Sequence, residues 1–132
     1  MYVKQESDEI DQYVKHRGWN NMRSTGTGLR YMIYEHGSGE QATKGKYAFV
    51  NYKITLLDGT VCYTSEKNGP KKFLIGQDHV ESGLHEGILF MKAGDKAIFI
   101  LPSHLAHGLM GDNDKIPARS SVVYDIELLS LR

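Results

Sequence analysis

The chain has 132 residues, 40% of them apolar, which is enough for one hydrophobic core but not for two. Sixteen basic and sixteen acidic side chains give a formal net charge of zero, which excludes the clustered positive charge of a general nucleic-acid-binding protein. We therefore expect a single main domain that has no nucleic-acid partner and recognises its partner by shape and apolar contact.

The first part of the chain, residues 1–27, predicts a helix followed by a linker. Ser7–Arg17 carries acidic residues near its start and basic residues near its end, which complements the helix dipole. Within it, Ile10, Tyr13 and Val14 form one apolar stripe. This stripe predicts docking, either against the main domain or against a partner subunit in a self-associated form, and the sequence leaves both alternatives open.

The remainder, residues 28–132, changes to an apolar period of two and is expected to form the main domain. The clearest strand is Lys46–Leu57, where alternate residues from Ala48 to Leu56 face the core. Asp58-Gly59 then predicts a tight hairpin, because this turn needs positive φ angles. Further strands are predicted over Leu29–Tyr34, Thr60–Thr64, Lys72–Ile75, Lys96–Leu101 and Val122–Leu131.

One short helix is predicted over Ser82–Lys92, with apolar residues at i, i+4 and i+7 from Leu84. Gly87 inside it costs about 1 kcal/mol relative to alanine, so we expect the helix to press closely on a sheet at this point. Residues 102–119 form a loop of a length that is usually functional in compact domains. Because strands outnumber helices and most connections suit antiparallel pairing, the predicted class is α+β.

The compartment stays open from sequence alone. The first residues are polar and acidic, unlike a signal peptide, and no run approaches the roughly 18 apolar residues of a membrane-spanning helix. We expect either a cytoplasmic protein or the mature form of a periplasmic or cell-envelope protein whose leader was removed. The single cysteine, Cys62, excludes an internal disulfide, and we expect it to pack in a strand rather than act as a nucleophile.

No metal or cofactor is predicted. His79, His85, His104 and His107 are not joined by cysteines at zinc spacing. The segment Asp112-Asn113-Asp114 resembles an oxygen-rich cation loop only superficially, because the later glycine and glutamate of that motif are missing. We expect this segment to be a solvated loop tip.

Seven short motifs follow one another along the main domain: Val50-Asn51-Tyr52, Leu57-Asp58-Gly59, Phe73-Leu74-Ile75-Gly76, Val80-Glu81-Ser82-Gly83, Ala93-Gly94-Asp95, Leu105-Ala106-His107-Gly108 and Val123-Tyr124-Asp125. Their order and gaps, over roughly Gly45–Leu131, resemble the FKBP family of peptidyl-prolyl isomerases. The N-terminal helix followed by Thr25–Leu29 also resembles the extension of envelope lipoprotein members of this family. The resemblance implies an FKBP-like curved antiparallel sheet wrapped around one short helix, with an N-terminal helical extension.

Members of this family catalyse cis–trans isomerisation of the peptide bond that precedes proline. The resemblance therefore implies an isomerase that acts on proline-containing polypeptides and aids protein folding. The barrier to this rotation is about 18–20 kcal/mol and comes from the partial double-bond character of the C–N bond. Because no covalent bond breaks, a dry pocket that favours the twisted bond is sufficient, and no cofactor is implied.

The resemblance places catalytic groups at Tyr52, Tyr63, His107 and Tyr124, and substrate-binding groups at Phe73, Val80, Glu81, Leu84 and Ile116. It implies that Tyr52, Leu84 and Tyr124 form an apolar well for the proline ring. It also implies that the backbone near Val80 and Glu81 holds the substrate chain.

Several of these positions depart from the family pattern. Tyr63 stands where many active members have an aspartate, and Leu84 replaces the tryptophan of the pocket floor. His107 replaces a tyrosine that donates a hydrogen bond to substrate; a neutral imidazole can also donate, and histidines change charge near neutral pH. Phe73 has a core role as an equal alternative. The departures imply weak catalysis, and the alternative is a non-catalytic polypeptide-binding or chaperone module with the same fold.

Overall fold

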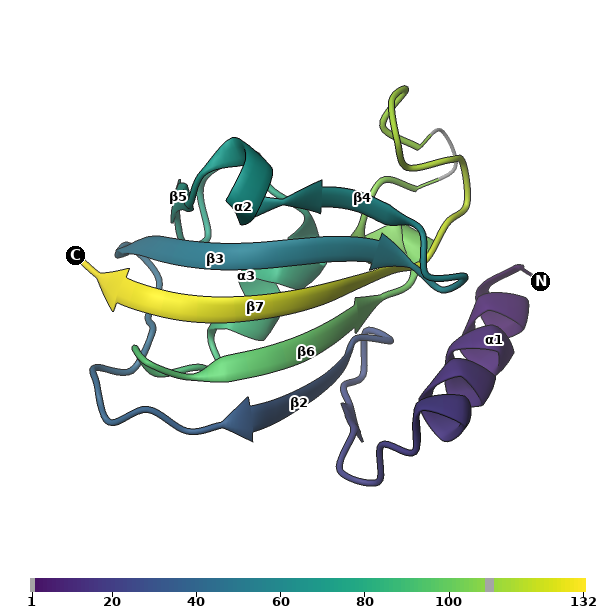
Figure 1. The fold of residues 1–132 in the computed structure, drawn as a ribbon, viewed down its shortest axis with the longest axis horizontal. Coiled ribbons are helices and arrows are strands. Elements are labelled where there is room, and N and C mark those ends of the chain that lie inside the picture. The colour runs from purple at the N-terminus through teal and green to yellow at the C-terminus, as the bar shows by residue number, and fades with distance from the viewer. Residues whose placement is uncertain (1, 109–110) are drawn as a thin grey trace.

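The computed structural model describes residues 2–108 and 111–132, and Figure 1 shows how their elements are arranged. The helices are α1 (Tyr2–Arg17), α2 (Ser65–Asn68) and α3 (Ser82–Ile88), with a 3₁₀ turn η1 (Ser103–Leu105). The strands are β1 (Arg23–Ser24), β2 (Arg30–Glu35), β3 (Tyr47–Leu56), β4 (Val61–Thr64), β5 (Lys71–Leu74), β6 (Lys96–Leu101) and β7 (Val122–Leu131). All six predicted strands are present with bounds that differ by at most one residue, and the α+β class is confirmed.

The strands form one antiparallel sheet in the order β1-β2-β6-β7-β3-β4. One edge of β3 is shared, since β5 pairs with its first half and β4 with its second half. The long strands β3 and β7 lie side by side, with Tyr52 opposite Ile126 and Ile54 opposite Tyr124. Tyr52 and Tyr124 are therefore diagonal neighbours on one face of the sheet, close enough for aromatic side chains to share a pocket wall.

The core lies between that face and α3, which Figure 1 shows behind β3 and β7. The predicted alternation is confirmed, because the even-numbered residues from Ala48 to Leu56 and from Val122 to Leu128 belong to or pack against one apolar cluster. Two glycines let α3 approach the sheet. A Cβ atom on Gly83 would lie 2.5 Å from the Leu101 side chain, and one on Gly87 would lie 2.8 Å from the Phe99 ring. This close approach is the reason expected for Gly87.

The helix α3 ends at Ile88, four residues before the predicted end. The amides of Leu89, Phe90 and Met91 each bond to the carbonyl three residues earlier, so the chain tightens and turns instead of continuing the α-helix. Met91 still lies in the apolar cluster. The apolar spacing therefore extends one turn beyond the helix itself.

The N-terminal helix α1 packs on the opposite face of the sheet from α3. Ile10 is 1% exposed and joins a second apolar cluster with Ile98, Ile100 and Val123, and Tyr13 packs against it. In Figure 1, α1 lies beside the end of the sheet where β6 ends and β7 begins. Of the two docking alternatives, the structure displays packing within the chain.

The segment predicted as a linker contains the short strand β1, whose Arg23 pairs with Tyr31 of β2. Arg30 ties this edge of the sheet to α1, because its guanidinium lies 2.5 Å from the Asp11 carboxylate and donates to Ser7 at 2.9 Å. Among the described residues, no helix has both the length and the apolar character needed to cross a membrane.

Candidate active site

The predicted site residues come from strands, from α3 and the two residues before it, and from the loop after β6, and they meet on the α3 side of the sheet. Those with apolar or aromatic side chains belong to or pack against the main cluster: Tyr52, Tyr63, Phe73, Val80, Leu84, Ile116 and Tyr124. The two polar ones, Glu81 and His107, contact each other at its edge. One site therefore contains residues from widely separated parts of the chain.

The floor of this site is closed. Leu84 is 0% exposed, and Ile116 and Tyr124 are each 2% exposed. Phe73 is 1% exposed with its ring edge-to-face against His85, which favours its core role. The half-buried side chains at the rim are those of Tyr52, Tyr63, Val80 and His107. A ligand would reach these rim groups first.

Tyr52 is held in place by the turn of helix that follows β4. The Ser65 hydroxyl accepts from the Tyr52 amide at 3.0 Å and donates to the Tyr52 carbonyl at 3.3 Å. Thr64 caps α2 by accepting from the Lys67 amide at 3.2 Å. The Lys71 amine lies 6.0 Å from the centre of the Tyr52 ring. The Ser65 hydroxyl thus bonds both backbone polar groups of Tyr52.

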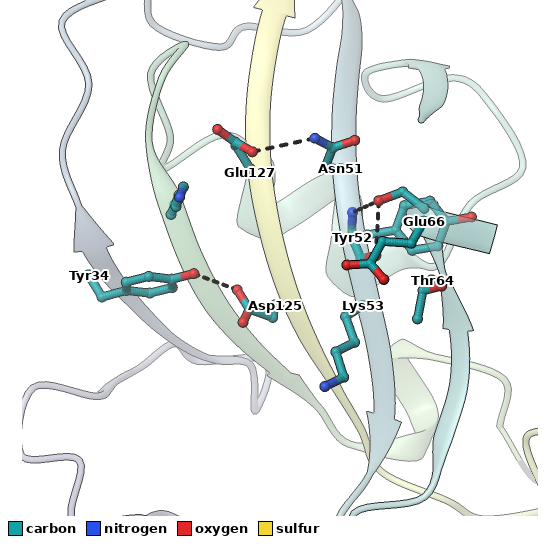
Figure 2. Close-up of a pocket in the computed structure, with 10 residues that line it drawn as sticks. Tyr34, Asn51, Tyr52, Lys53, Thr64, Glu66, Asp125 and Glu127 are labelled. Atoms are coloured by element: carbon teal, nitrogen blue, oxygen red, sulfur yellow. Dashed lines mark hydrogen bonds between the residues drawn. The ribbon is translucent and has the colours of Figure 1, made fainter. Parts of the chain in front are cut away.

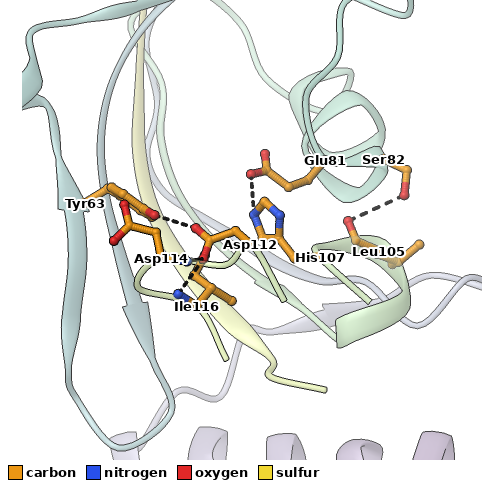
Figure 3. A network of polar contacts seen from close by, with 8 residues as sticks. All are labelled: Tyr63, Glu81, Ser82, Leu105, His107, Asp112, Asp114 and Ile116. Atoms are coloured by element: carbon orange, nitrogen blue, oxygen red, sulfur yellow. Dashed lines mark hydrogen bonds and ion pairs between the residues drawn. The ribbon is translucent and has the colours of Figure 1, made fainter. Parts of the chain in front are cut away.

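The Tyr63 hydroxyl donates a hydrogen bond to Asp112 in the loop after β6, as Figure 3 shows. The other Asp112 oxygen accepts from the amides of Ile116 at 2.8 Å and Asp114 at 3.0 Å. The bond to Asp112, together with burial, raises the pKa of Tyr63 to about 12. Partial burial raises the pKa of Asp112, but the bonds from Tyr63, Ile116 and Asp114, with His107 nearby, outweigh it and lower the pKa below its ordinary value.

The expectation that residues 112–114 form a solvated tip is therefore wrong for Asp112, although Asn113 and Asp114 are exposed. Tyr63 lies 49 residues away from Asp112, so no local pattern could identify this partner. An aspartate that accepts from backbone amides two and four residues later is typical of a turn-forming side chain. That local signal was present in the sequence.

Glu81 and His107 form the second polar contact of the site (Figure 3), with His107 Nε2 3.0 Å from Glu81 Oε1. The Glu81 side chain is 9% exposed and that of His107 is 28% exposed. Glu81 Oε2 and the Tyr124 hydroxyl are both buried and, within the described residues, have no hydrogen-bond partner. Burial first, and the Glu81 carboxylate second, raise the pKa of Tyr124 well above its ordinary value.

Cys62 lies beside the site with 3% of its surface exposed. Its sulfur is 3.6 Å from the Lys115 carbonyl oxygen. Burial, and then the nearby Asp112 carboxylate, raise the pKa of the thiol, which disfavours the reactive thiolate. In the part of the chain that the structure describes, no three His, Cys, Asp or Glu side chains gather as metal ligands would.

A hollow of about 260 Å³ lies on the outer face of the sheet and is lined in part by Tyr52 (Figure 2). Its polar groups bind each other, since Tyr34 donates to Asp125 at 2.6 Å and Asn51 donates to Glu127 at 3.4 Å. Its lining is largely polar and charged, so the apolar cluster on the α3 side is the better candidate for a proline ring.

Comparison with known proteins shows the family to which the chain belongs. The sequence profile of the FKBP-type peptidyl-prolyl cis-trans isomerase family matches residues 38–129. A probable FKBP-type peptidyl-prolyl cis-trans isomerase FkpA from Neisseria meningitidis serogroup B is 37% identical over 113 residues, which are 85% of this chain and 41% of the relative. FkpA from Escherichia coli K12 is 35% identical over 123 residues, or 92% of this chain and 43% of the relative.

Solved structures show the same fold. The crystal structure of FkpA from Escherichia coli superposes with a TM-score of 0.84 and 34% identity, covering 96% of this chain and 59% of that one. The crystal structure of AtFKBP13 gives a TM-score of 0.80 and 29% identity, covering 84% and 98%. The chain spans about two fifths of the length of the bacterial curated relatives it matches. It belongs to the FKBP-type peptidyl-prolyl cis-trans isomerase family.

Proposed function

We propose that the chain catalyses cis–trans isomerisation of Xaa-Pro bonds in polypeptides and so aids protein folding. The observation that carries this proposal is the convergence of Tyr52, Leu84 and Tyr124 around one closed apolar floor in a chain of this family. A proline ring in that well leaves the preceding peptide bond at the rim, where water is partly excluded. Each 1.4 kcal/mol by which the site favours the twisted bond gives about a tenfold rate increase.

His107 acts on the substrate through one ring nitrogen. Its Nε2 faces the Glu81 carboxylate and donates to it, so Nδ1 is the nitrogen left for substrate. In the neutral ring that carries its proton on Nε2, Nδ1 is an acceptor; in the imidazolium it is a donor. His107 therefore donates to a substrate carbonyl through Nδ1 only as the imidazolium.

Tyr63 and Asp112 play a different part in this proposal. Their hydrogen bond joins β4 to the loop after β6 across the groove, which shields the twisting bond from water. Tyr63 stands where active members have an aspartate, and Asp112 restores a carboxylate to this side of the groove from the loop. The binding of proline-containing polypeptides thus needs the β4 strand and the loop together.

A proline-limited refolding assay tests the proposal. The wild-type chain should accelerate the slow phase, which takes tens of seconds or longer uncatalysed. Tyr52→Ala should lose most of the acceleration. His107→Gln should keep some activity, because its side-chain amide can also donate to a substrate carbonyl. A refolding rate with the wild-type chain that equals the uncatalysed rate would refute the proposal.

The second candidate is a polypeptide-binding or chaperone module without catalysis. The complete burial of Leu84, which leaves little open floor for a proline ring, favours it. Chemical-shift mapping with a proline peptide separates the two functions. Binding at the groove without exchange between the cis and trans peptide signals indicates the module, and exchange indicates the enzyme.

The remaining expectations are also proposals. Residues 28–132 form the isomerase unit, and residues 1–27 form its helical extension, which self-associates only if α1 leaves the sheet. Periplasmic or cell-envelope location is proposed from the resemblance of that extension to envelope members. Size-exclusion chromatography and fractionation of cells that express the full-length protein test these two points. No nucleic-acid partner is proposed, because the net charge is zero.

A further inference from the structure

The helix α1 contributes a buried carboxylate to the loop that carries part of the active site. Glu6 is 6% exposed, whereas the neighbouring acidic residues Asp8 and Glu9 are exposed. Glu6 and Ile10 are four residues apart and therefore lie on the same face of the helix. Ile10 already gives that face apolar contact with the sheet. A carboxylate in the same buried row must be held by hydrogen bonds, because burial removes its water.

Three donors hold the Glu6 carboxylate. The Ser103 amide lies 2.7 Å from Oε1, the Ser103 hydroxyl 2.7 Å from Oε2, and the Ser121 hydroxyl 3.3 Å from Oε1. Both serines are buried, at 1% and 7% exposed. Hydrogen bonds to a charged acceptor are shorter and stronger than neutral ones. Glu6 therefore makes a specific polar contact rather than a general docking contact.

The two serines mark the two ends of the loop between β6 and β7. Ser103 follows β6 by two residues, and Ser121 immediately precedes β7. The loop between them carries His107, Asp112 and Ile116. A single side chain of α1 thus bridges both ends of the loop that completes the groove.

The contact continues directly to His107. The Ser103 carbonyl accepts from the amides of Ala106 at 3.0 Å and Gly108 at 2.7 Å, the two residues that flank His107. The loop then closes on itself, since the Arg119 amide donates to the Gly108 carbonyl at 2.9 Å. A shift of Ser103 would therefore move the backbone that aims His107 at Glu81.

We propose that Glu6 is a positioning residue for the groove: by bridging Ser103 and Ser121 it fixes the loop so that His107 and Ile116 face the substrate. Isomerase activity then depends on α1 being docked on the sheet. The activity part of this inference rests on the proposed function. The positioning part does not, because the geometry of the loop can be measured in a chain without activity.

The test compares Glu6→Ala, Glu6→Gln and Glu9→Ala in the full chain, below the unfolding temperature of each variant. Alanine leaves the buried Ser103 amide without its acceptor. Glutamine keeps one carbonyl oxygen for the Ser103 amide and Ser121, and its amide can donate to the Ser103 hydroxyl. Glu9 is the matched control, since it lies on the same helix but is exposed.

Two readouts are taken from each variant: kcat/KM on a proline peptide, and the NMR signals of the Ala106 and Gly108 amides and the His107 ring. We expect Glu6→Ala to lower kcat/KM about tenfold, as displaced positioning groups do, and to shift these signals. Glu6→Gln and Glu9→Ala should match the wild type in both. A purely structural role for Glu6 would lower the melting temperature and leave both readouts unchanged.

The inference is overturned if folded Glu6→Ala keeps kcat/KM within about twofold of wild type and its loop signals at wild-type positions. If the wild-type chain has no isomerase activity, the proposed function fails and the NMR signals alone decide the positioning role. If Glu6→Ala does not fold, Ser121→Ala takes its place, because it removes one of the three bonds and keeps Glu6. It should shift the same signals by a smaller amount, and unchanged signals would then refute the inference.

Discussion

The buried hydroxyl of Tyr124 offers a sharp test of the site described here. Tyr124 is 2% exposed, and its hydroxyl has no hydrogen-bond partner among the described residues. A hydroxyl that loses water without gaining a partner costs about 1–3 kcal/mol. Tyr124→Phe removes that group and keeps the ring, so it creates no large cavity. We expect the variant to be more stable than the wild type.

The size of the stability change in Tyr124→Phe depends on the groups that face the Tyr124 hydroxyl. Glu81 Oε2 is also buried without a hydrogen-bond partner in the described structure, and its charge acts on the hydroxyl even without good bond geometry. Losing this interaction offsets part of the gain. We therefore expect a net stabilisation of about 1 kcal/mol, at the low end of the cost of an unpaired hydroxyl. For a domain of this size, that corresponds to a rise in melting temperature of about 3–5 °C.

Urea unfolding at pH 7 measures this change, with Tyr52→Phe as the matched control. Tyr52 has the same chemistry on the same sheet face, but it is half-buried at the rim, so its variant should stay within about 0.5 kcal/mol of wild type. A double-mutant cycle with Glu81→Gln then isolates the interaction between the two side chains. Destabilisation of Tyr124→Phe by about 1 kcal/mol or more, with coupling of similar size to Glu81, would show that the hydroxyl is well bonded and would refute the reasoning.

Two further predictions concern the loop and the helix. Asp112→Asn should destabilise the fold at pH 7 by about 1 kcal/mol, through its weaker bonds to Tyr63 and the loop amides. The folded-state pKa of Asp112 lies below its unfolded value, so the stabilisation by the ionised carboxylate is present above about pH 4 and is lost as the pH falls. A difference in stability between the wild type and Asp112→Asn that persists at about pH 2 would contradict this prediction. Gly87→Ala should cost about 1–2 kcal/mol in thermal unfolding, since overpacking against Phe99 exceeds the gain in helix propensity. Gly26→Ala, whose Cβ would meet nothing within 4 Å, should be neutral or slightly stabilising, and equal effects of the two glycine variants would refute the packing explanation.

The strands were predictable because the alternation of apolar and polar residues within each strand indicates which of its faces is buried. The alternation from Ala48 to Leu56 can be satisfied only by a strand with one buried face, and the structure buries that face under α3. The end of α3 was less predictable. The apolar spacing runs on to Met91, whereas the hydrogen bonds change type after Ile88 because the chain must turn toward β6.

The positions of the site residues followed from the family resemblance, but their polar partners did not. Asp112 contacts Tyr63, and Glu81 contacts His107. The two residues of each pair are too far apart in the sequence for a local pattern to predict the contact. These pairings also change the expected chemistry. Asp112 restores a carboxylate that the substitution at residue 63 had removed, and Glu81 occupies the ring nitrogen that His107 would otherwise offer to substrate.

The sequence by itself determined the class of fold, the strands and their facing residues, because apolar periodicity is a local property of the chain. Only the tertiary structure decided which surface the α1 stripe covers and that Glu6 reaches Ser103 and Ser121. An apolar stripe predicts that a helix docks, but it does not indicate the surface on which the helix docks. The docking surface is determined by the apolar side chains and unpaired hydrogen-bond donors that the folded sheet and its loops present. These groups come together only when strands that are distant in the sequence have paired.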